Sequence, residues 1–308
     1  MVYAYREVAS GLRFPEGPVV LGDGSVVLVE IAGRAITRVF ADGTTEVIAD
    51  CPGGPNGLAL GPDGQIYICN NGGGFNFATT DGVLHPAGGE PDYSGGRIER
   101  LDLASGEIVE LFREVEGRAL MMPNDIVFDR QGGFYFTDFG HRAKGAQHYG
   151  ALYYGRTDGG APVRVAGDLI SPNGVGLSPD ERKVYVAETY TGRLKAFDIV
   201  APGQVAGVPM FEPGRALHAQ VEGFRRYDSL AVEADGAVCI GSLTPGGITV
   251  IDAQGKHRET EIMPDLFPTN IAFGGADMRT AFVTLSGSGR LIAVEWPRAG
   301  LVLNYQQR

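Results

Sequence analysis

The sequence predicts an all-β protein, a six-bladed β-propeller with four-stranded antiparallel blades around a central channel. Three observations predict it: a polar-then-apolar motif that recurs six times, a turn signal behind each copy, and a further strand behind each turn. A repeat of this length is typical of propellers, in which a blade needs its neighbours to bury both faces. We expect one domain over residues 1–308.

The first element of each unit is an inner strand that opens on an oxygen-bearing side chain. PNGLAL, PNDIVF, PNGVGL and PTNIAF are near copies, while FPEGPVV and YDSLAV carry an acid in place of the amide. The opening residues, called the anchors below, are spaced by 40 to 68 residues, with an insertion in the second unit. They are Glu16, Asn56, Asn124, Asn173, Asp228 and Asn270.

The second, third and fourth strands follow from turn chemistry. Asp-Gly and similar pairs between hydrophobic runs favour hairpins, as in LGDGSVVLVE (21–30) and VEADGAVCIG (232–241). A glycine then precedes the third strand, as in GRAITRVF (33–40), and a second turn leads to a fourth, as in FADGTTEVIAD (40–50). For the outer strand of the last blade two segments compete, YREVA (5–9) and LVLNY (301–305).

Composition and charge narrow the class of partner. A net charge of −11 without a run of Lys or Arg argues against nucleic acid and anionic membranes. The N-terminus has no signal-peptide pattern and no apolar run is long enough to span a membrane, so we expect a cytoplasmic protein. Cys51, Cys69 and Cys239 form no CxxC pair and are expected to be buried, reduced thiols.

The anchors predict a metal site, because the first strands of all blades run in the same direction along the channel. Their opening residues therefore form a ring at one mouth, where Glu16 and Asp228 would repel each other unless a cation neutralises them. Six hard oxygen donors without His or Cys fit one calcium ion best, with magnesium, zinc or manganese as substitutes. The alternative is that each amide only caps its own strand by bonding local backbone.

The motifs FPEGP, PNDIVFD, SPNGVGLSPD, YDSLAVEADG and TNIAFGGADMRTAFVT, in this order, resemble the senescence marker protein, gluconolactonase and luciferin-regenerating enzyme family of six-bladed propellers. The resemblance implies a metal-dependent hydrolase, most often a lactonase, and related propellers hydrolyse organophosphates. It implies metal ligands at Glu16, Asn173 and Asp228. Asn124 matches a position that ligates either the metal or the substrate.

One departure from the family bears on the substrate. Sugar-lactone members often carry an arginine two residues before the amide equivalent to Asn124, where this chain has Met122, preceded by Met121. Methionine offers adaptable apolar surface in place of hydrogen bonds, which favours a more apolar lactone or ester.

Long loops between second and third strands should flank the same mouth. Residues 71–96 carry Phe75, Phe77, His85 and Tyr93, and residues 139–150 carry His141 and His148. Loops of this length are usually functional or disordered, so we expect either a lid or a mobile surface loop. Candidate substrate contacts are Asn56, Met122, His141, His148 and Asn270. The TDFG stretch at Thr137 has no kinase context, so Asp138 is expected to end a strand near the channel.

The expected chemistry is metal-assisted hydrolysis of a lactone. Asp228 would activate water as the general base, Asn124 would orient the substrate, and Glu16 and Asn173 would hold the metal. Two alternatives remain: a metal-dependent phosphotriesterase on the same ring, and a non-catalytic propeller that binds protein.

Overall fold

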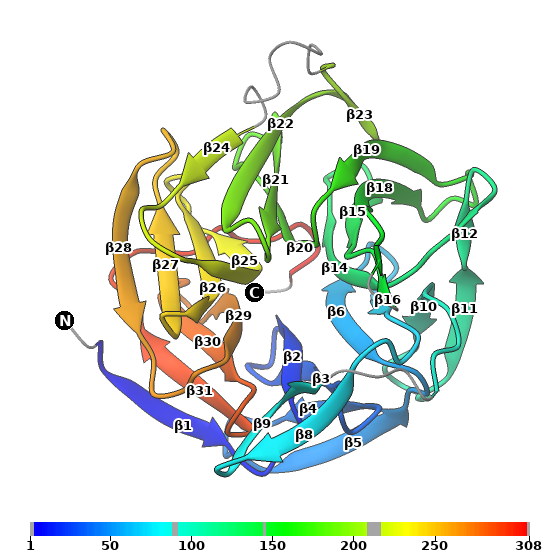
Figure 1. Cartoon of the computed structure of the whole chain (residues 1–308). Coiled ribbons are helices and arrows are strands. Elements are labelled where there is room, and N and C mark those ends of the chain that lie inside the picture. The colour runs from blue at the N-terminus through cyan, green and yellow to red at the C-terminus, as the bar shows by residue number, and fades with distance from the viewer. Residues whose placement is uncertain (1–2, 88–91, 144–145, 208–216, 307–308) are drawn as a thin grey trace.

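The computed structural model describes residues 3–87, 92–143, 146–207 and 217–306. For Arg142, Ala143 and Gln147 it describes the backbone only. Six antiparallel sheets are arranged in a ring, as the sequence predicts, and their first strands surround a central channel (Figure 1). Among the described residues there is no helix with the length and hydrophobicity needed to cross a membrane.

The first three blades follow one another along the chain. Blade 1 contains β2 (Pro15–Val20), β3 (Val26–Glu30), β4 (Ala35–Val39) and β5 (Thr45–Asp50). Blade 2 contains β6 (Pro55–Leu60), β7 (Ile66–Asn70), β10 (Arg97–Leu101) and β11 (Ile108–Phe112). Blade 3 contains β14 (Pro123–Phe128), β15 (Gly133–Asp138), β18 (Gly150–Arg156) and β19 (Val163–Leu169).

The last three blades complete the ring. Blade 4 contains β20 (Pro172–Leu177), β21 (Lys183–Glu188), β22 (Arg193–Ala201) and β24 (Leu217–Gln220), with β23 (Gln204–Val205) also on β22. Blade 5 contains β25 (Arg226–Val232), β26 (Val238–Thr244), β27 (Gly247–Ile251) and β28 (His257–Ile262). Blade 6 contains β29 (Pro268–Gly274), β30 (Thr280–Leu285), β31 (Arg290–Glu295) and β1 (Tyr5–Ala9).

The ring is closed by the N-terminal strand. β1 pairs antiparallel with β31, with Tyr5 opposite Val294, so residues 5–9 supply the outer strand of the last blade. The competing segment, LVLNY, crosses the far mouth of the channel, where the C-terminal end of the chain lies at the centre of the ring (Figure 1). There Leu301 N–H donates to Val232 O over 2.8 Å, and Asn304 Nδ2 donates to Phe128 O over 3.1 Å.

Short hairpins lie in the connections between the blade strands. The insertion in blade 2 forms β8 (Asn76–Thr80) and β9 (Val83–Ala87), which pair with each other and lie over the face where the inner strands begin (Figure 1). The pairs β12 (Glu114–Val115) with β13 (Arg118–Ala119), and β16 (Arg142–Ala143) with β17 (Ala146–Gln147), are shorter. The structure therefore gives the insertion a defined hairpin. Whether this hairpin opens and closes as a lid stays a prediction.

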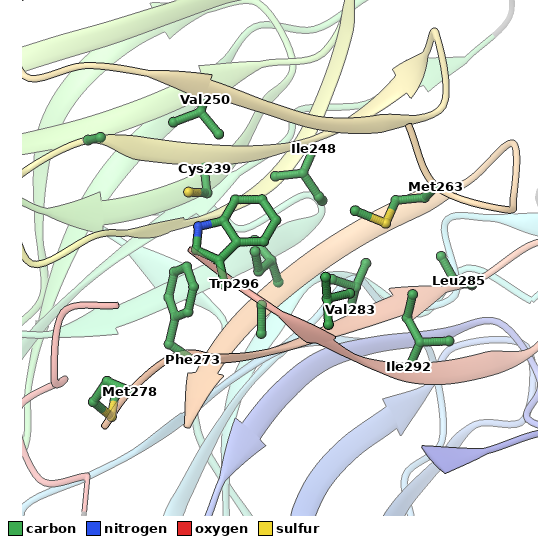
Figure 2. Close-up of a cluster of buried hydrophobic side chains, with 14 residues drawn as sticks. Cys239, Ile248, Val250, Met263, Phe273, Met278, Val283, Leu285, Ile292 and Trp296 are labelled. Carbon is green, nitrogen blue, oxygen red and sulfur yellow. The ribbon is translucent and has the colours of Figure 1, made fainter. Parts of the chain in front are cut away.

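The core consists of apolar clusters between neighbouring blades. Between blades 5 and 6, Trp296 packs against Phe273, with ring centroids 6.1 Å apart, beside Ile248 and Val283 (Figure 2). Trp296 Nε1 donates to the buried Glu233 Oε1 over 2.7 Å, so the indole N–H is satisfied. Cys51, Cys69 and Cys239 are free and buried within such clusters, as expected.

Candidate metal centre and active site

A local irregularity in each inner strand positions its anchor. The pairing of β2 with β3 shifts register between Glu16 and Val19. A register shift also occurs beside the anchor in the inner strand of each of the remaining five blades. An interrupted ladder of this kind bends a strand and re-aims a side chain. The six anchors thus come together at one mouth of the channel, as the repeat predicts.

The residue after the anchor is glycine where neighbouring inner strands touch. A Cβ on Gly17 would lie 2.4 Å from Asn56 O, and one on Gly57 would lie 2.5 Å from Asn124 O. The same position in blade 4, Gly174, would meet Asp228 O at 2.8 Å. The Asn-Gly and Glu-Gly pairs of the sequence therefore allow the anchors to converge.

Only one of the two Glu16 carboxylate oxygens accepts hydrogen bonds within the described residues. Its Oε2 accepts hydrogen bonds from Gly17 N–H at 2.5 Å and from Asn270 Nδ2 at 2.7 Å. Its Oε1 is buried and has no hydrogen-bond partner among the described residues. Burial raises the pKa of Glu16 to about 6, although the Asn270 and Gly17 hydrogen bonds act in the opposite direction. The carboxyl group is thus arranged to receive a positive ligand at Oε1.

Asp228, the anchor of blade 5, interacts electrostatically with Glu16. Burial of the carboxyl group, followed by repulsion from Glu16, raises the pKa of Asp228 well above its usual range. The residue nevertheless keeps some exposure to solvent, unlike Glu16, which is 2% exposed. Two carboxyl groups whose pKa values are both raised, in one site, favour the binding of a cation.

The two amide anchors next to these acids differ in how they are held. Asn173 Nδ2 donates to Thr189 Oγ1 over 3.1 Å, and its Oδ1 accepts from Ser229 Oγ over 3.3 Å. Asn124 is 3% exposed, and its Oδ1 has no hydrogen-bond partner among the described residues. Asn173 is therefore fixed in orientation, while the Asn124 oxygen can accept from a ligand or coordinate a cation.

The donor set suits a divalent cation with oxygen ligands. Two buried oxygens, Glu16 Oε1 and Asn124 Oδ1, have no hydrogen-bond partner within the described parts of the chain, and buried oxygens are normally satisfied. Carboxylate and amide oxygens without sulfur or imidazole are the ligands of calcium and magnesium. In the described part of the chain no group of three or more His, Cys, Asp or Glu could hold a metal, so any site here depends on the amides.

The remaining two anchors behave differently from each other. Asn270 uses both polar atoms, since Nδ2 donates to Glu16 Oε2 and Oδ1 accepts from Ile271 N–H at 2.8 Å. Asn270 therefore orients the Glu16 carboxylate through Nδ2. Its bond to Ile271 N–H is the local strand capping that the sequence analysis left open as an alternative for every anchor. Asn56 is 4% exposed, and its side chain makes no hydrogen bond within the described residues.

Asp125 is a site residue that the sequence-based prediction missed. It occupies the position where neighbouring blades have Gly57 and Gly174, and its Oδ2 accepts from Val175 N–H of β20 over 3.0 Å. Burial, reinforced by Glu16, raises the pKa of Asp125 to about 8. This carboxyl group ties β14 to β20 directly below Asn124 and Asn173. The available signal was the acid in PND, where PNG stands in the copies before and after it.

Aromatic side chains form an arc over the same face. The ring of Phe139 lies 6.1 Å from that of Phe75 and 5.7 Å from that of Tyr190, and Arg226 stacks over Tyr190 at 5.6 Å. These residues, which we call the aromatic arc, come from blades 2, 3, 4 and 5. Of them, only Phe75 was singled out in the sequence, because proximity between blades leaves no local pattern.

The Met122 side chain is buried by its neighbours and does not face solvent. It is 4% exposed, its Sδ lies 3.5 Å from His141 Nδ1, and a Cβ on Gly74 would lie 2.7 Å from its sulfur. Asp138, which ends β15 as expected, fixes the backbone here by accepting from the N–H groups of Met121 and Met122. The methionines therefore form part of the apolar packing around the mouth.

The loop aromatics and histidines separate into two groups. His141 stacks on Tyr93 with ring centroids 5.0 Å apart, beside Met122 and close to the mouth. Phe77 packs on Phe14, and His85 lies on β9 within hydrogen-bonding distance of Thr80 Oγ1. His148 is exposed, and its N–H donates to His141 O over 2.7 Å.

Comparison with known families identifies a match over most of the chain. The family model described as the SMP-30/Gluconolactonase/LRE-like region matches residues 14–287, from the first inner strand to the last blade. The chain belongs to the SMP-30/gluconolactonase/LRE-like family. The matched range includes all six anchors of this SMP-30/gluconolactonase/LRE-like chain.

Among curated proteins, the SMP-30/gluconolactonase/LRE-like chain is similar to bacterial lactonases. Lactonase drp35 of Staphylococcus saprophyticus is 25% identical over 243 residues, which cover 78% of this chain and 67% of that protein. Lactonase drp35 of Staphylococcus haemolyticus is 27% identical over 251 residues, which cover 81% of this chain and 69% of that protein.

Solved structures share the propeller fold. A gluconolactonase of Xanthomonas campestris aligns with a TM-score of 0.75 and 24% identity, over 94% of this chain and 89% of that one. Regucalcin of Agrobacterium tumefaciens, a calcium-binding protein, aligns with a TM-score of 0.73 and 19% identity, over 98% and 99% of the two chains. At these identities the likeness shows the fold alone.

Proposed function

We propose that this protein is a divalent-metal-dependent lactonase whose active site is the anchor ring. The observation that carries the proposal is the pair of acids Glu16 and Asp228 at the channel mouth, beside buried amide and carboxylate oxygens that have no partner among the residues the structure describes. The similarity to drp35 lactonases supports the type of reaction. The residues that would hold the metal are Glu16, Asn124, Asn173 and Asp228, and calcium suits their oxygens best.

The protein's own groups would divide the chemistry among them. A bound cation would act as a Lewis acid towards the lactone carbonyl oxygen. Asp228 takes a proton from the attacking water and returns it to the ring oxygen, so that the carbonyl carbon gains a hydroxyl and the ring C–O bond breaks. Its partial exposure leaves room for that water. Asn124 orients the substrate, and Glu16, held by Asn270, keeps the opposite side of the site fixed.

The aromatic arc supports an apolar substrate. Phe75, Phe139 and Tyr190 present ring surface near the mouth, and burying apolar surface contributes about 25 cal/mol per Å². A polyhydroxylated sugar lactone would leave hydroxyls desolvated against these rings. We therefore propose that alkyl or aryl lactones are better substrates than gluconolactone.

A substrate panel with defined metal content tests the proposal. Protein treated with a chelator would be assayed on an aryl lactone, gluconolactone, an aryl ester and a phosphotriester, each with calcium, magnesium, zinc or manganese restored and spontaneous hydrolysis subtracted. The proposal expects metal-dependent turnover that is fastest on the aryl lactone. Fastest turnover of the phosphotriester would assign the site to phosphotriester hydrolysis. No turnover of any substrate would favour a binding propeller.

A further inference from the structure

A second hollow lies on the face that carries the metal centre, beneath the β8–β9 hairpin. This cavity has a volume of about 410 Å³. Its walls include Arg13 and Arg34 from loops of blade 1, Asn71 at the end of β7, and Phe75 and Phe77 from the insertion. None of the six anchors lines it, so it is separate from the metal centre, although Gly54 on its wall lies two residues before Asn56.

The hairpin that covers the cavity is anchored to the blades. The ring of Phe77 packs on that of Phe14 with centroids 4.8 Å apart, and Phe14 has a positive φ of 59°, in the left-handed region. Leu84 N–H donates to Gly287 O of blade 6 over 2.9 Å. A non-glycine residue in this conformation costs free energy, which packing of the aromatic pair offsets. These two contacts hold the hairpin to blades 1 and 6.

The charge on the cavity wall is opposite to that of the whole protein. The charged residues that line it are both arginines, and no described lining residue is acidic, in a chain with 37 acids and 26 Lys and Arg. Arg34 forms an ion pair with Asp92 at 3.0 Å. The backbone N–H of Arg13 donates to Glu30 Oε2 over 2.7 Å, whereas its exposed guanidinium has no partner in the described parts of the chain.

Asn71 adds an unsatisfied donor to the same wall. Its Oδ1 accepts from the N–H groups of Gly73 and Gly74, over 2.9 and 3.1 Å, which fixes the direction of the amide. Its Nδ2 is buried and has no hydrogen-bond partner among the described residues. A buried donor of this kind costs about 1–3 kcal/mol when it is left unpaired. An acceptor supplied by a ligand would remove that cost.

We propose that this cavity binds a carboxylate carried on a short apolar chain. The Arg13 guanidinium and the Asn71 amide would donate to the carboxylate oxygens, and Phe75 and Phe77 would contact the chain. Arginine suits a carboxylate because its planar N–H groups form charge-assisted hydrogen bonds. Phe75 also belongs to the aromatic arc, so one ligand could occupy both regions. Binding of the carboxylate does not depend on the proposed function. The further statement that the substrate is a lactone with a carboxylate side chain rests on the proposed function.

Calorimetric titration of the full chain with two isosteric probes tests the binding. The probes are 3-phenylpropionate and its neutral amide, 3-phenylpropionamide, and the protein is first stripped of metal with a chelator. We expect the carboxylate to bind at least about tenfold more tightly than the amide. Arg13→Gln should remove this preference, as should Asn71→Asp, which keeps the acceptor for the glycine N–H groups. Arg182→Gln, at a side chain that is 85% exposed on another blade, should leave it unchanged.

Three results would overturn the proposal. The first is equal affinity for the carboxylate and the amide. The second is a preference that survives both Arg13→Gln and Asn71→Asp. The third is carboxylate binding that needs added calcium, because the carboxylate would then lie at the metal centre. Binding with the expected pattern in a protein that hydrolyses no lactone would leave the site in place and remove only the proposed function.

Discussion

Asn270 in the last blade donates a hydrogen bond to Glu16 in the first blade, with 2.7 Å between Nδ2 and Oε2. The two residues are 254 positions apart in the chain, so this bond joins the ends of the repeat at the channel mouth. It also orients the Glu16 carboxyl group, whose other oxygen faces the site without a partner among the described residues. One hydrogen bond therefore both joins the first and last blades and orients a carboxyl group of the proposed metal centre.

Replacement of Asn270 should weaken both properties. Asn270→Ala removes a hydrogen bond to a charged group, and we expect the free energy of unfolding to fall by about 1.5–3 kcal/mol, with weaker calcium binding. Asn56→Ala is the matched control, because Asn56 is an equally buried anchor that makes no such bond in the described structure. Denaturant unfolding and calcium titration of both variants measure the difference. Equal losses in the two variants would contradict a specific role for the Asn270–Glu16 bond.

The metal content of the purified protein is a direct prediction of the anchor ring. We expect about one divalent ion per chain after dialysis, measured by elemental analysis, and substantially less in Glu16→Ala. Glu7→Ala, which changes a glutamate on the outer strand β1, should retain the ion. A metal-free wild-type protein with full lactonase activity would refute metal dependence.

Asp228→Asn separates proton transfer from metal binding. The substitution keeps one oxygen that can ligate a metal but removes the basicity, so turnover should fall by about two to four orders of magnitude. Metal content should fall much less. Kinetics of a metal-loaded variant provide the measurement, with Asp252→Asn in an exposed turn as the control. Near-normal turnover would mean that another group activates the water.

The stability of the metal-free protein should fall as the pH rises from about 4.5 to 6. Burial raises the pKa of Glu16 to about 6 in the folded chain, above its usual value near 4.3 when unfolded. The folded state therefore holds a proton that the unfolded state has already lost, and each pH step in this window lowers the free energy of unfolding. Between pH 4.5 and 6 the loss due to Glu16 is about 1 kcal/mol.

Added calcium should reverse that trend, because ligands bind metal in their deprotonated form and affinity rises with pH. Thermal unfolding at several pH values, with chelator and with saturating calcium, gives both slopes. Glu16→Gln does not titrate, so its slope in chelator should be flatter than that of the wild type. Identical slopes for the two proteins would show that Glu16 does not carry the effect.

Tyr190 tests the contribution of the aromatic arc to substrate choice. Tyr190 is 41% exposed, so Tyr190→Ala should leave the fold intact while lowering kcat/KM for an aryl lactone by about tenfold. Gluconolactone turnover should change little. Tyr149→Ala, at an exposed tyrosine on the same face but outside the arc, is the control. Equal effects on both lactones would argue against a role in apolar recognition.

The repeat made most of the fold predictable from sequence. Each unit carries its own turn and strand signals, so the six blades and the positions of their anchors follow from local chemistry. The closing strand was less certain, because two short segments, 5–9 and 301–305, were both candidates for it. The structure decides for residues 5–9, and the other segment bonds instead to the ends of inner strands, as Leu301 does to Val232.

Parts of the candidate site were beyond prediction because they depend on contacts between blades. Asp125 bonds to Val175 of the next blade, and Phe139 lies between Phe75 and Tyr190 of two others. Nothing in the local sequence specifies these pairs. Met122 was expected to offer its side chain to substrate, yet Gly74 from a distant loop packs against it. The residue types were visible, but their neighbours were set by the tertiary fold.

The pairing of β1 with β31 also constrains the order of events during synthesis. Residues 5–9 are translated about 280 residues before their partner, Arg290–Glu295. At typical rates of about 5–20 residues per second, the first strand waits roughly 15–60 s without its partner. Closure of so long a loop also carries a large entropic cost. The last blade should therefore complete only after residue 295 has left the ribosome, and nascent chains that stop before residue 290 should expose β1 to proteolysis.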